Sequence, residues 1–158
     1  MTIVLATALW AAAEVARMVR PHAVEPGRQL WTAAVALAWL HAALAFGAVY
    51  GWSHRTAVLA TARQTAAVTG LDWGGGLYVN YLFLIAWALD ALWWWLAPTT
   101  QLARSFRFEQ LRLAFFVFMF VNGAIVFAAG LARATGIVAV AAVCAAWALR
   151  ERRMLRHA

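Results

Sequence analysis

The stretch Leu77–Pro98, LYVNYLFLIAWALDALWWWLAP, decides the fold. A helix of about 20 apolar residues crosses the roughly 30 Å of hydrocarbon in a bilayer, and this run is long enough to do so. It carries one acid, Asp90, and closes with three consecutive tryptophans at positions 93–95. A carboxyl group in hydrocarbon is costly, so Asp90 requires a structural or functional reason.

The composition of the whole chain agrees with this stretch. Of its 158 residues, 66% are hydrophobic and 12% are charged, and the mean hydropathy is +0.74. Soluble domains are about 45–50% apolar and about 25% charged. The net charge of +7 comes from 13 arginines against 6 acids, and the arginines lie singly or in small groups between apolar runs. That placement favours orientation in a membrane over binding of nucleic acid.

The sequence predicts an all-α, polytopic transmembrane bundle that forms one domain over residues 1–158. Five apolar runs are candidate membrane helices: Thr2–Val19, Leu30–Trp52, Leu77–Ala97, Leu111–Leu131 and Gly136–Leu149. The first has Glu14 and Arg17 in its last turn and the fifth is short, so four helices is the alternative. The first run lacks the basic region of a signal peptide, and we expect it to be retained.

Arginine placement predicts the orientation of the bundle. With an external N-terminus and a cytoplasmic C-terminus, ten arginines lie on the cytoplasmic side, including Arg20 and Arg156, and three lie outside. Lys and Arg are retained on the cytoplasmic side, so this arrangement is favoured, and it requires an odd number of crossings. We therefore expect five helices in a bacterial-type inner membrane.

The connection after the second run is predicted to hold an external amphipathic helix over residues 53–69. Thr61, Gln64, Thr65 and Thr69 are expected to face water, whereas Val58, Ala62 and Ala66 are expected to face lipid or protein. An external polar cluster follows from this placement: His54, Arg55, Arg63, Gln64, Asp72, Tyr78, Asn80 and Tyr81. It could hold an anionic ligand or a partner protein, but arginines in such positions more often contact phospholipid headgroups.

Three polar side chains lie near the middle of three different runs. His41 is the twelfth of 23 residues, Asn122 the twelfth of 21 and Asp90 the fourteenth of 21 in their runs. Intramembrane polar residues are functional candidates by default, and a His–Asp pair could hold a proton. Hydrogen bonds that only fix helix packing are the more common role. Glu14 and Arg17, three residues apart, are expected to form an ion pair.

A hydrophobic cofactor is a further possibility. Trp39, Trp87, Trp94 and Met119 are candidate ligand-lining residues, and His41 with Met119 could supply axial ligands to haem. A chlorin or a quinone against Trp39 and Trp87 is an alternative, although aromatic residues at depth more often serve packing alone. No metal site is predicted, because Cys144 is the only cysteine and no metal-binding motif is present.

The favoured function is that of a non-catalytic subunit or accessory partner in a larger membrane assembly. Catalytic signatures such as Gly-x-Ser-x-Gly are absent from the sequence, so an enzyme is not expected. The expected partners are the lipid bilayer and other membrane subunits or further copies of the chain. The alternatives are a small proton-linked transporter or channel using His41, Asp90 and Asn122, and a binder of haem, chlorin or quinone.

Overall fold

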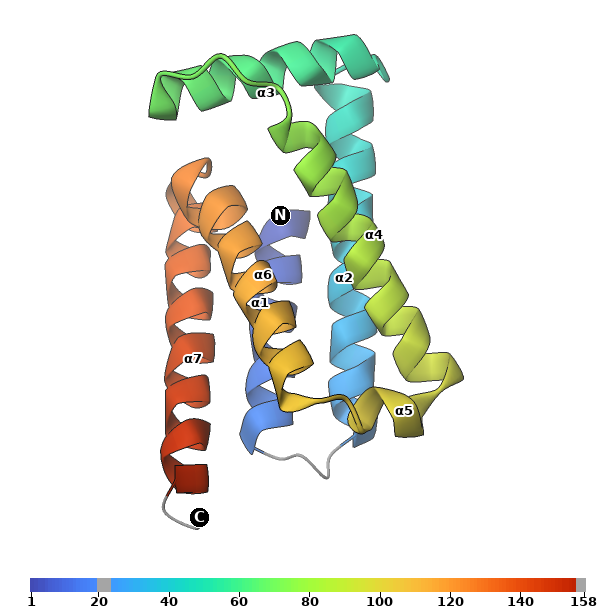
Figure 1. Ribbon diagram of the computed structural model, residues 1–158. Coiled ribbons are helices and arrows are strands. Elements are labelled where there is room, and N and C mark those ends of the chain that lie inside the picture. The colour runs from blue at the N-terminus through green and yellow to red at the C-terminus, as the bar shows by residue number, and fades with distance from the viewer. Residues whose placement is uncertain (20–23, 156–158) are drawn as a thin grey trace.

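The structure is a computed structural model that describes residues 1–19 and 24–155, and it is a bundle of helices with one helix lying across its end (Figure 1). The described residues contain no strand. The elements in chain order are α1 (Thr2–Val19), α2 (Val24–Ala48), α3 (His54–Thr69), α4 (Gly76–Leu96), α5 (Pro98–Leu102), α6 (Phe106–Phe120), the π-helical turn η1 (Val121–Val126) and α7 (Gly130–Leu155).

Five helical segments of the described residues are long and apolar enough to cross a membrane. They are Thr2–Val19, Val24–Ala48, Gly76–Leu96, Phe106–Val126 and Gly130–Arg153. The prediction of an all-helical chain with five such segments is therefore confirmed. The side of the membrane on which each end lies stays a prediction, and Arg20 and Arg156 fall outside the described residues.

Helix ends differ from the ends of the apolar runs by several residues. α2 begins at Val24, six residues before the predicted start at Leu30, and α7 covers 26 residues where a run of 14 was expected. Hydropathy marks only the hydrocarbon section, whereas a helix continues until its backbone is capped. Ser105 provides such a cap for α6, because its side chain accepts a hydrogen bond from the amide of Phe108.

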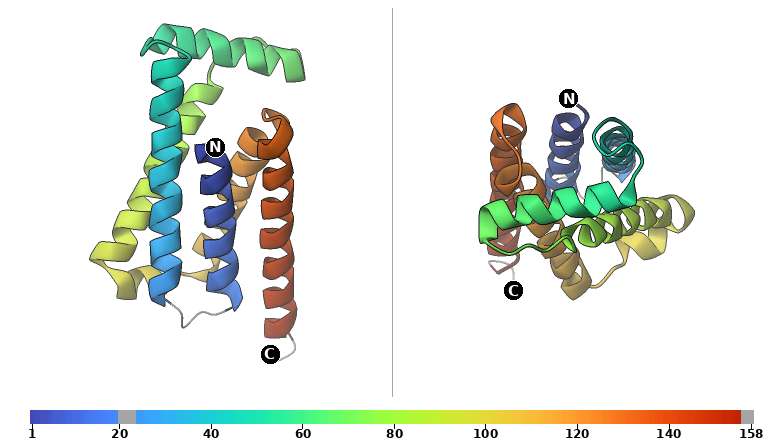
Figure 2. Two further views of the ribbon diagram at one scale, coloured as in Figure 1. Left: turned by 180° about the vertical axis from the view of Figure 1, so that it is seen from behind. Right: turned by 90° about the horizontal axis from the view of Figure 1, so that it is seen from above.

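The bundle has two distinct ends. α3 lies across one of them, here called the α3 end, as the view from above shows (Figure 2). At the opposite end, here called the arginine-rich end, Arg17, Arg104, Arg112 and Arg150 gather around one cavity. A glycine allows the segment before α4 to pass close to α3, since a Cβ at Gly74 would lie 2.8 Å from the carbonyl oxygen of Val58. Only glycine permits this close approach.

α1 occupies the middle of the bundle and packs against α2 and α7. Ala6 and Ala13 of α1, and Ala34 and Ala38 of α2, are all buried. Small side chains let membrane helices approach closely, which explains why this alanine-rich chain can bury α1 on two sides.

An aromatic layer separates the two ends. Its members are Trp10, Trp31, Phe83, Trp87, Phe116 and Phe120. Trp10 stacks on Phe120 with ring centroids 3.9 Å apart, and Trp87 lies 5.5 Å from both Trp31 and Phe116. Such aromatic pairs stabilise beyond their burial alone, by about 0.5–1.5 kcal/mol each. The two candidate sites described below lie on opposite sides of this layer.

Candidate functional site

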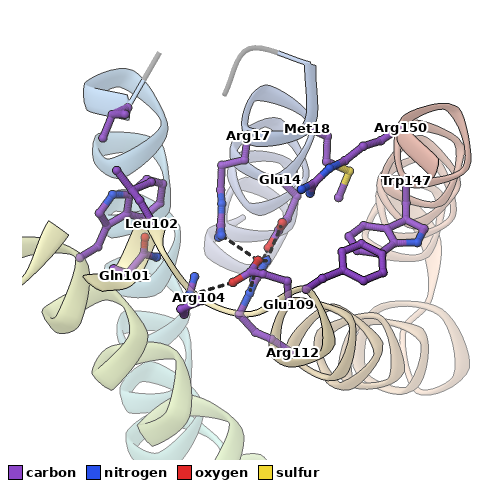
Figure 3. Close-up of a pocket in the computed structure, with 13 residues that line it drawn as sticks. Glu14, Arg17, Met18, Gln101, Leu102, Arg104, Glu109, Arg112, Trp147 and Arg150 are labelled. Atoms are coloured by element: carbon purple, nitrogen blue, oxygen red, sulfur yellow. Dashed lines mark hydrogen bonds and ion pairs between the residues drawn. The ribbon is translucent and has the colours of Figure 1, made fainter. Parts of the chain in front are cut away.

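A network of buried ion pairs joins α1, α4 and α6 at the arginine-rich end. Figure 3 shows its members on α1 and α6 together with Arg104. Arg112 donates hydrogen bonds to both carboxylate oxygens of Glu14, with Nη2 at 2.9 Å from Oε2. Glu109 lies at the centre, since it pairs with Arg17 at 2.9 Å, with Arg104 at 2.7 Å and with Arg112 at 3.1 Å. We call these residues, together with Asp90, the charge network.

Asp90 belongs to this network and is not a partner of His41 or Asn122. Arg104, in the loop after α5, pairs with its Oδ1. The Arg104 side chain is 3% exposed and that of Asp90 8%, so the pair is shielded from solvent. Among the described residues, no hydrogen bond or ion pair joins Asp90 to His41 or Asn122. The network therefore contains three acids and three arginines, and its formal charge is zero.

The expected ion pair between Glu14 and Arg17 does not form. Arg17 reaches Glu109 of α6 and Glu14 binds Arg112, 98 residues away in sequence. An exposed pair within one helix is worth only tenths of a kcal/mol. A buried carboxylate instead needs several hydrogen bonds, which the fork of Arg112 supplies.

Aromatic rings cover the arginines on the side that faces the bundle interior. The guanidinium carbon of Arg17 lies 5.0 Å from the Trp94 ring centroid and 5.8 Å from that of Trp31. Arg112 lies 5.2 Å from Trp31 and 5.6 Å from Phe116. Cation–π attraction is strongest where the cation is desolvated, so these aromatic rings help to stabilise the buried guanidinium groups.

A cavity of about 670 Å³ occupies the opposite side of the aromatic layer, beneath α3. It lies beside the part of α2 that extends past the first turn of α1. The hydroxyl of Thr2 lies 3.3 Å from Nδ1 of His41, so α1 begins level with His41 while α2 continues to Ala48. Those seven additional residues correspond to about 10 Å. α3 closes the space that α1 leaves unfilled.

The cavity is apolar at its floor and polar at its roof. Trp87, Phe83, Leu84, Met119 and Phe120 line the part next to the aromatic layer, whereas Thr61, Gln64, Thr65, Thr69 and Asn80 line the part under α3 and the start of α4. None of the described lining residues is Asp, Glu or Arg. The site therefore suits an uncharged molecule with one polar end.

The polar face of α3 lines the cavity. Thr61, Gln64, Thr65 and Thr69 were expected to face water; all four line the cavity, and Gln64 and Thr69 are also exposed. The threonine hydroxyls donate to carbonyl oxygens four residues earlier, at 2.8–2.9 Å, so their oxygens keep lone pairs that can accept hydrogen bonds. The outward face carries Arg55, Leu59 and Arg63 instead, which are exposed.

His41 and Asn122 both line this cavity, on α2 and η1. Asn122 donates from Nδ2 to the carbonyl oxygen of Phe118 at 2.8 Å, and its Oδ1 has no hydrogen bond within the described ranges. His41 contacts Thr2 through Nδ1, which leaves Nε2 available. An imidazole nitrogen and an amide oxygen thus remain for a ligand at the depth of α1's first turn.

The candidate ligand-lining residues separate into three groups. Trp87 and Met119 line the cavity beneath α3, and Trp94 lines the cavity at the arginine-rich end. Trp39 lines neither, because its side chain lies on the outer face of α2 and is 45% exposed. Its role as a ligand contact stays a prediction, because residue depth does not reveal which way a helical face turns.

The external polar cluster does not gather at one point. Gln64, Asn80, Arg55, Arg63 and Asp72 are all exposed, but only Gln64 and Asn80 among them line the cavity. His54 lies 3.2 Å from the hydroxyl oxygens of both Tyr78 and Tyr81, where its ring connects α3 to α4. Tyr81 in turn lines the cavity. His54 therefore links the first turn of α3 to α4 beside the cavity.

Sequence reasoning missed the charge network as a unit. One signal was present, because Glu14 and Arg112 both fall near the predicted cytoplasmic ends of their runs. Two opposite charges at one depth on different helices are candidates for pairing, since neither is stable alone in hydrocarbon.

No protein-family model, curated protein or solved structure matches this chain.

Proposed function

We propose that this protein binds an uncharged amphipathic molecule in the cavity beneath α3. The observation that carries this proposal is the lining: an apolar floor, a polar roof and no ionised side chain among the described residues. Ligand pockets of about 300–1,000 Å³ suit small organic molecules, and the cavity measures about 670 Å³. The polar end of the ligand lies under α3 and its apolar body rests against Trp87.

The ligand's polar end carries a carbonyl or hydroxyl group. Gln64 and Asn80 offer amide groups with no hydrogen bond among the described residues, and threonine oxygens beside them can accept. A quinone fits this pattern better than haem does, because haem carries two propionates and the lining offers them no cation. His41 and Met119 nevertheless both line the cavity, so a Soret band in the purified protein would revive haem.

Orientation and compartment form part of the proposal. We place the arginine-rich end on the cytoplasmic side of a bacterial-type inner membrane, with α3 external, because ten of 13 arginines then lie inside. The ligand would then be held in the outer half of the bilayer.

Two other functions stay predictions. A role as a subunit or accessory partner of a larger membrane assembly, or of a homo-oligomer, is compatible with ligand binding. Proton-linked transport has less support, because it relies on contact between His41 and Asp90, and Asp90 pairs with Arg104.

Native mass spectrometry of protein purified from membranes in maltoside detergent tests the proposal. Ala42 lines the cavity and Ala43, the next residue, faces outward. We expect the wild type and Ala43→Trp to carry one neutral organic molecule, and Ala42→Trp to lose it because the indole projects into the cavity and obstructs the space that the ligand needs. Equal occupancy in both variants, or an empty wild type, would contradict the proposal.

A further inference from the structure

A second, smaller cavity lies at the arginine-rich end, lined by residues of α1, α2, α4, α5, α6 and α7 and by Arg104 of the loop after α5. Figure 3 shows its lining. Its volume is about 220 Å³. Glu14 and Arg17 of α1 form one wall, Gln101 of α5 another, and Arg150 of α7 a third. The charge network therefore borders an open space, and some of its polar atoms make no hydrogen bond within the described residues.

The lining of this small cavity carries a surplus of positive charge. Four arginines, Arg17, Arg104, Arg112 and Arg150, face two glutamates, Glu14 and Glu109. Asp90 does not line the cavity, but it pairs with Arg104 and offsets one further positive charge. One positive charge remains, and it is that of Arg150, whose guanidinium lies 5.5 Å from the Trp147 ring centroid and forms no ion pair within the described ranges.

Several buried groups at this cavity lack a hydrogen-bond partner among the described residues. Gln101 is only 2% exposed, and neither its Nε2 nor its Oε1 is bonded. Nη1 of Arg17 and Nη2 of Arg104 are unpartnered as well. Buried polar groups are normally satisfied, so three unused donors beside one cavity indicate a missing acceptor.

Three unpartnered acceptors, one of which is Oε1 of Gln101 itself, do not change this balance. Glu109 Oε1 lies 2.7 Å from Nε of Arg104, where the charges attract although the hydrogen-bond angle is poor. Oδ2 of Asp90 is also unbonded, but Asp90 does not line the cavity. The free groups that line the space are thus mainly donors.

We propose that this cavity binds a phosphate group, with Gln101, Arg17 and Arg104 donating hydrogen bonds and Arg150 supplying the net charge. Arginine suits phosphate because its planar fork matches the oxygens. The volume lies below the range of about 300–1,000 Å³ for larger organic ligands. The site therefore holds either free phosphate or the phosphate of a lipid headgroup whose acyl chains lie outside.

Thermal unfolding tests the proposal and separates the two sources. In the first arm, inorganic phosphate is titrated at constant ionic strength into delipidated protein in maltoside micelles. In the second arm, nanodiscs of phosphatidylglycerol are compared with nanodiscs of an uncharged galactolipid that has no phosphate. Stabilisation in the first arm identifies free phosphate, and stabilisation in the second arm alone identifies a headgroup. A midpoint that changes in neither arm overturns the proposal.

Matched variants separate this site from general attraction to a basic surface. Arg150→Gln removes a charge from the cavity, and Arg153→Gln removes an equal charge from an exposed position on the same helix. We expect Arg150→Gln and Gln101→Leu to weaken the phosphate response at least about tenfold, each against its own baseline, and Arg153→Gln to leave it unchanged. An equal loss in Arg150→Gln and Arg153→Gln, or an undiminished response in Arg150→Gln, would refute the assignment even if Gln101→Leu did not fold.

Discussion

Replacing Glu14 by glutamine should destabilise the protein severely, because it leaves Arg112 buried with half of its partners. The Glu14 side chain is 1% exposed and that of Arg112 7%. Two unit charges about 4 Å apart attract by about 4 kcal/mol at an effective dielectric of about 20. Breaking a buried ion pair from one side typically costs about 3–5 kcal/mol, and we expect Glu14→Gln to fall in that range.

The control is an ion pair of the same chemistry in water. Glu25 pairs with Arg28 three residues later in α2, and its side chain is 54% exposed. Surface pairs are worth about 0–1 kcal/mol, so Glu25→Gln should have little effect. The two variants differ mainly in burial, since each removes one carboxylate charge from a helix.

The assay is unfolding in mixed micelles with increasing dodecyl sulfate, followed by loss of helical circular dichroism. A double variant, Glu14→Leu with Arg112→Met, should recover part of the lost stability because it leaves no unpaired charge in that pair. Glu109 then keeps Arg17 and Arg104 as partners. Two results would contradict the role of the network in joining α1 to α6. One is a cost of less than about 1 kcal/mol for Glu14→Gln. The other is a double variant whose loss of stability equals the sum of the losses in Glu14→Leu alone and Arg112→Met alone.

Two further predictions concern packing. A Cβ at Gly136 would lie 2.6 Å from the carbonyl oxygen of Ala124, so Gly136→Ala should lower the free energy of unfolding by about 1–3 kcal/mol. A Cβ at Gly123 would meet nothing within 4 Å, so Gly123→Ala should be neutral or slightly stabilising in the same unfolding assay. Trp87→Ala should cost about 3–5 kcal/mol because Trp87 is fully buried, and Trp39→Ala, on the outer face, should cost far less; similar losses for the two tryptophans would contradict the aromatic layer.

Much of the fold could be predicted because hydrocarbon imposes strong constraints on composition. Five apolar runs gave the five long helices, and the Thr- and Ala-rich segment at 53–69 coincides with α3 over His54–Thr69. Helix ends could not be placed well. Caps such as Ser105 extend α6 to Phe106, well before its apolar run begins at Leu111.

The sites were harder to predict because periodicity shows which residues share a face but not which helix lies opposite. Asp90 was expected near His41 at similar depth, yet Arg104 reaches it from the loop after α5. The polar face of α3 was assigned to water, because the pattern of the sequence does not show that this face borders a cavity.

The most direct test of the central claim is photo-crosslinking with a long-chain alcohol that carries a diazirine, followed by mapping of adducts by mass spectrometry. Binding beneath α3 predicts adducts concentrated on the inner face of α3 and on residues 118–127, retained in Ala43→Trp and lost in Ala42→Trp. Adducts spread over outward-facing residues such as Leu82 and Leu89, equally in both variants, would show that the probe meets the protein only as bulk lipid does.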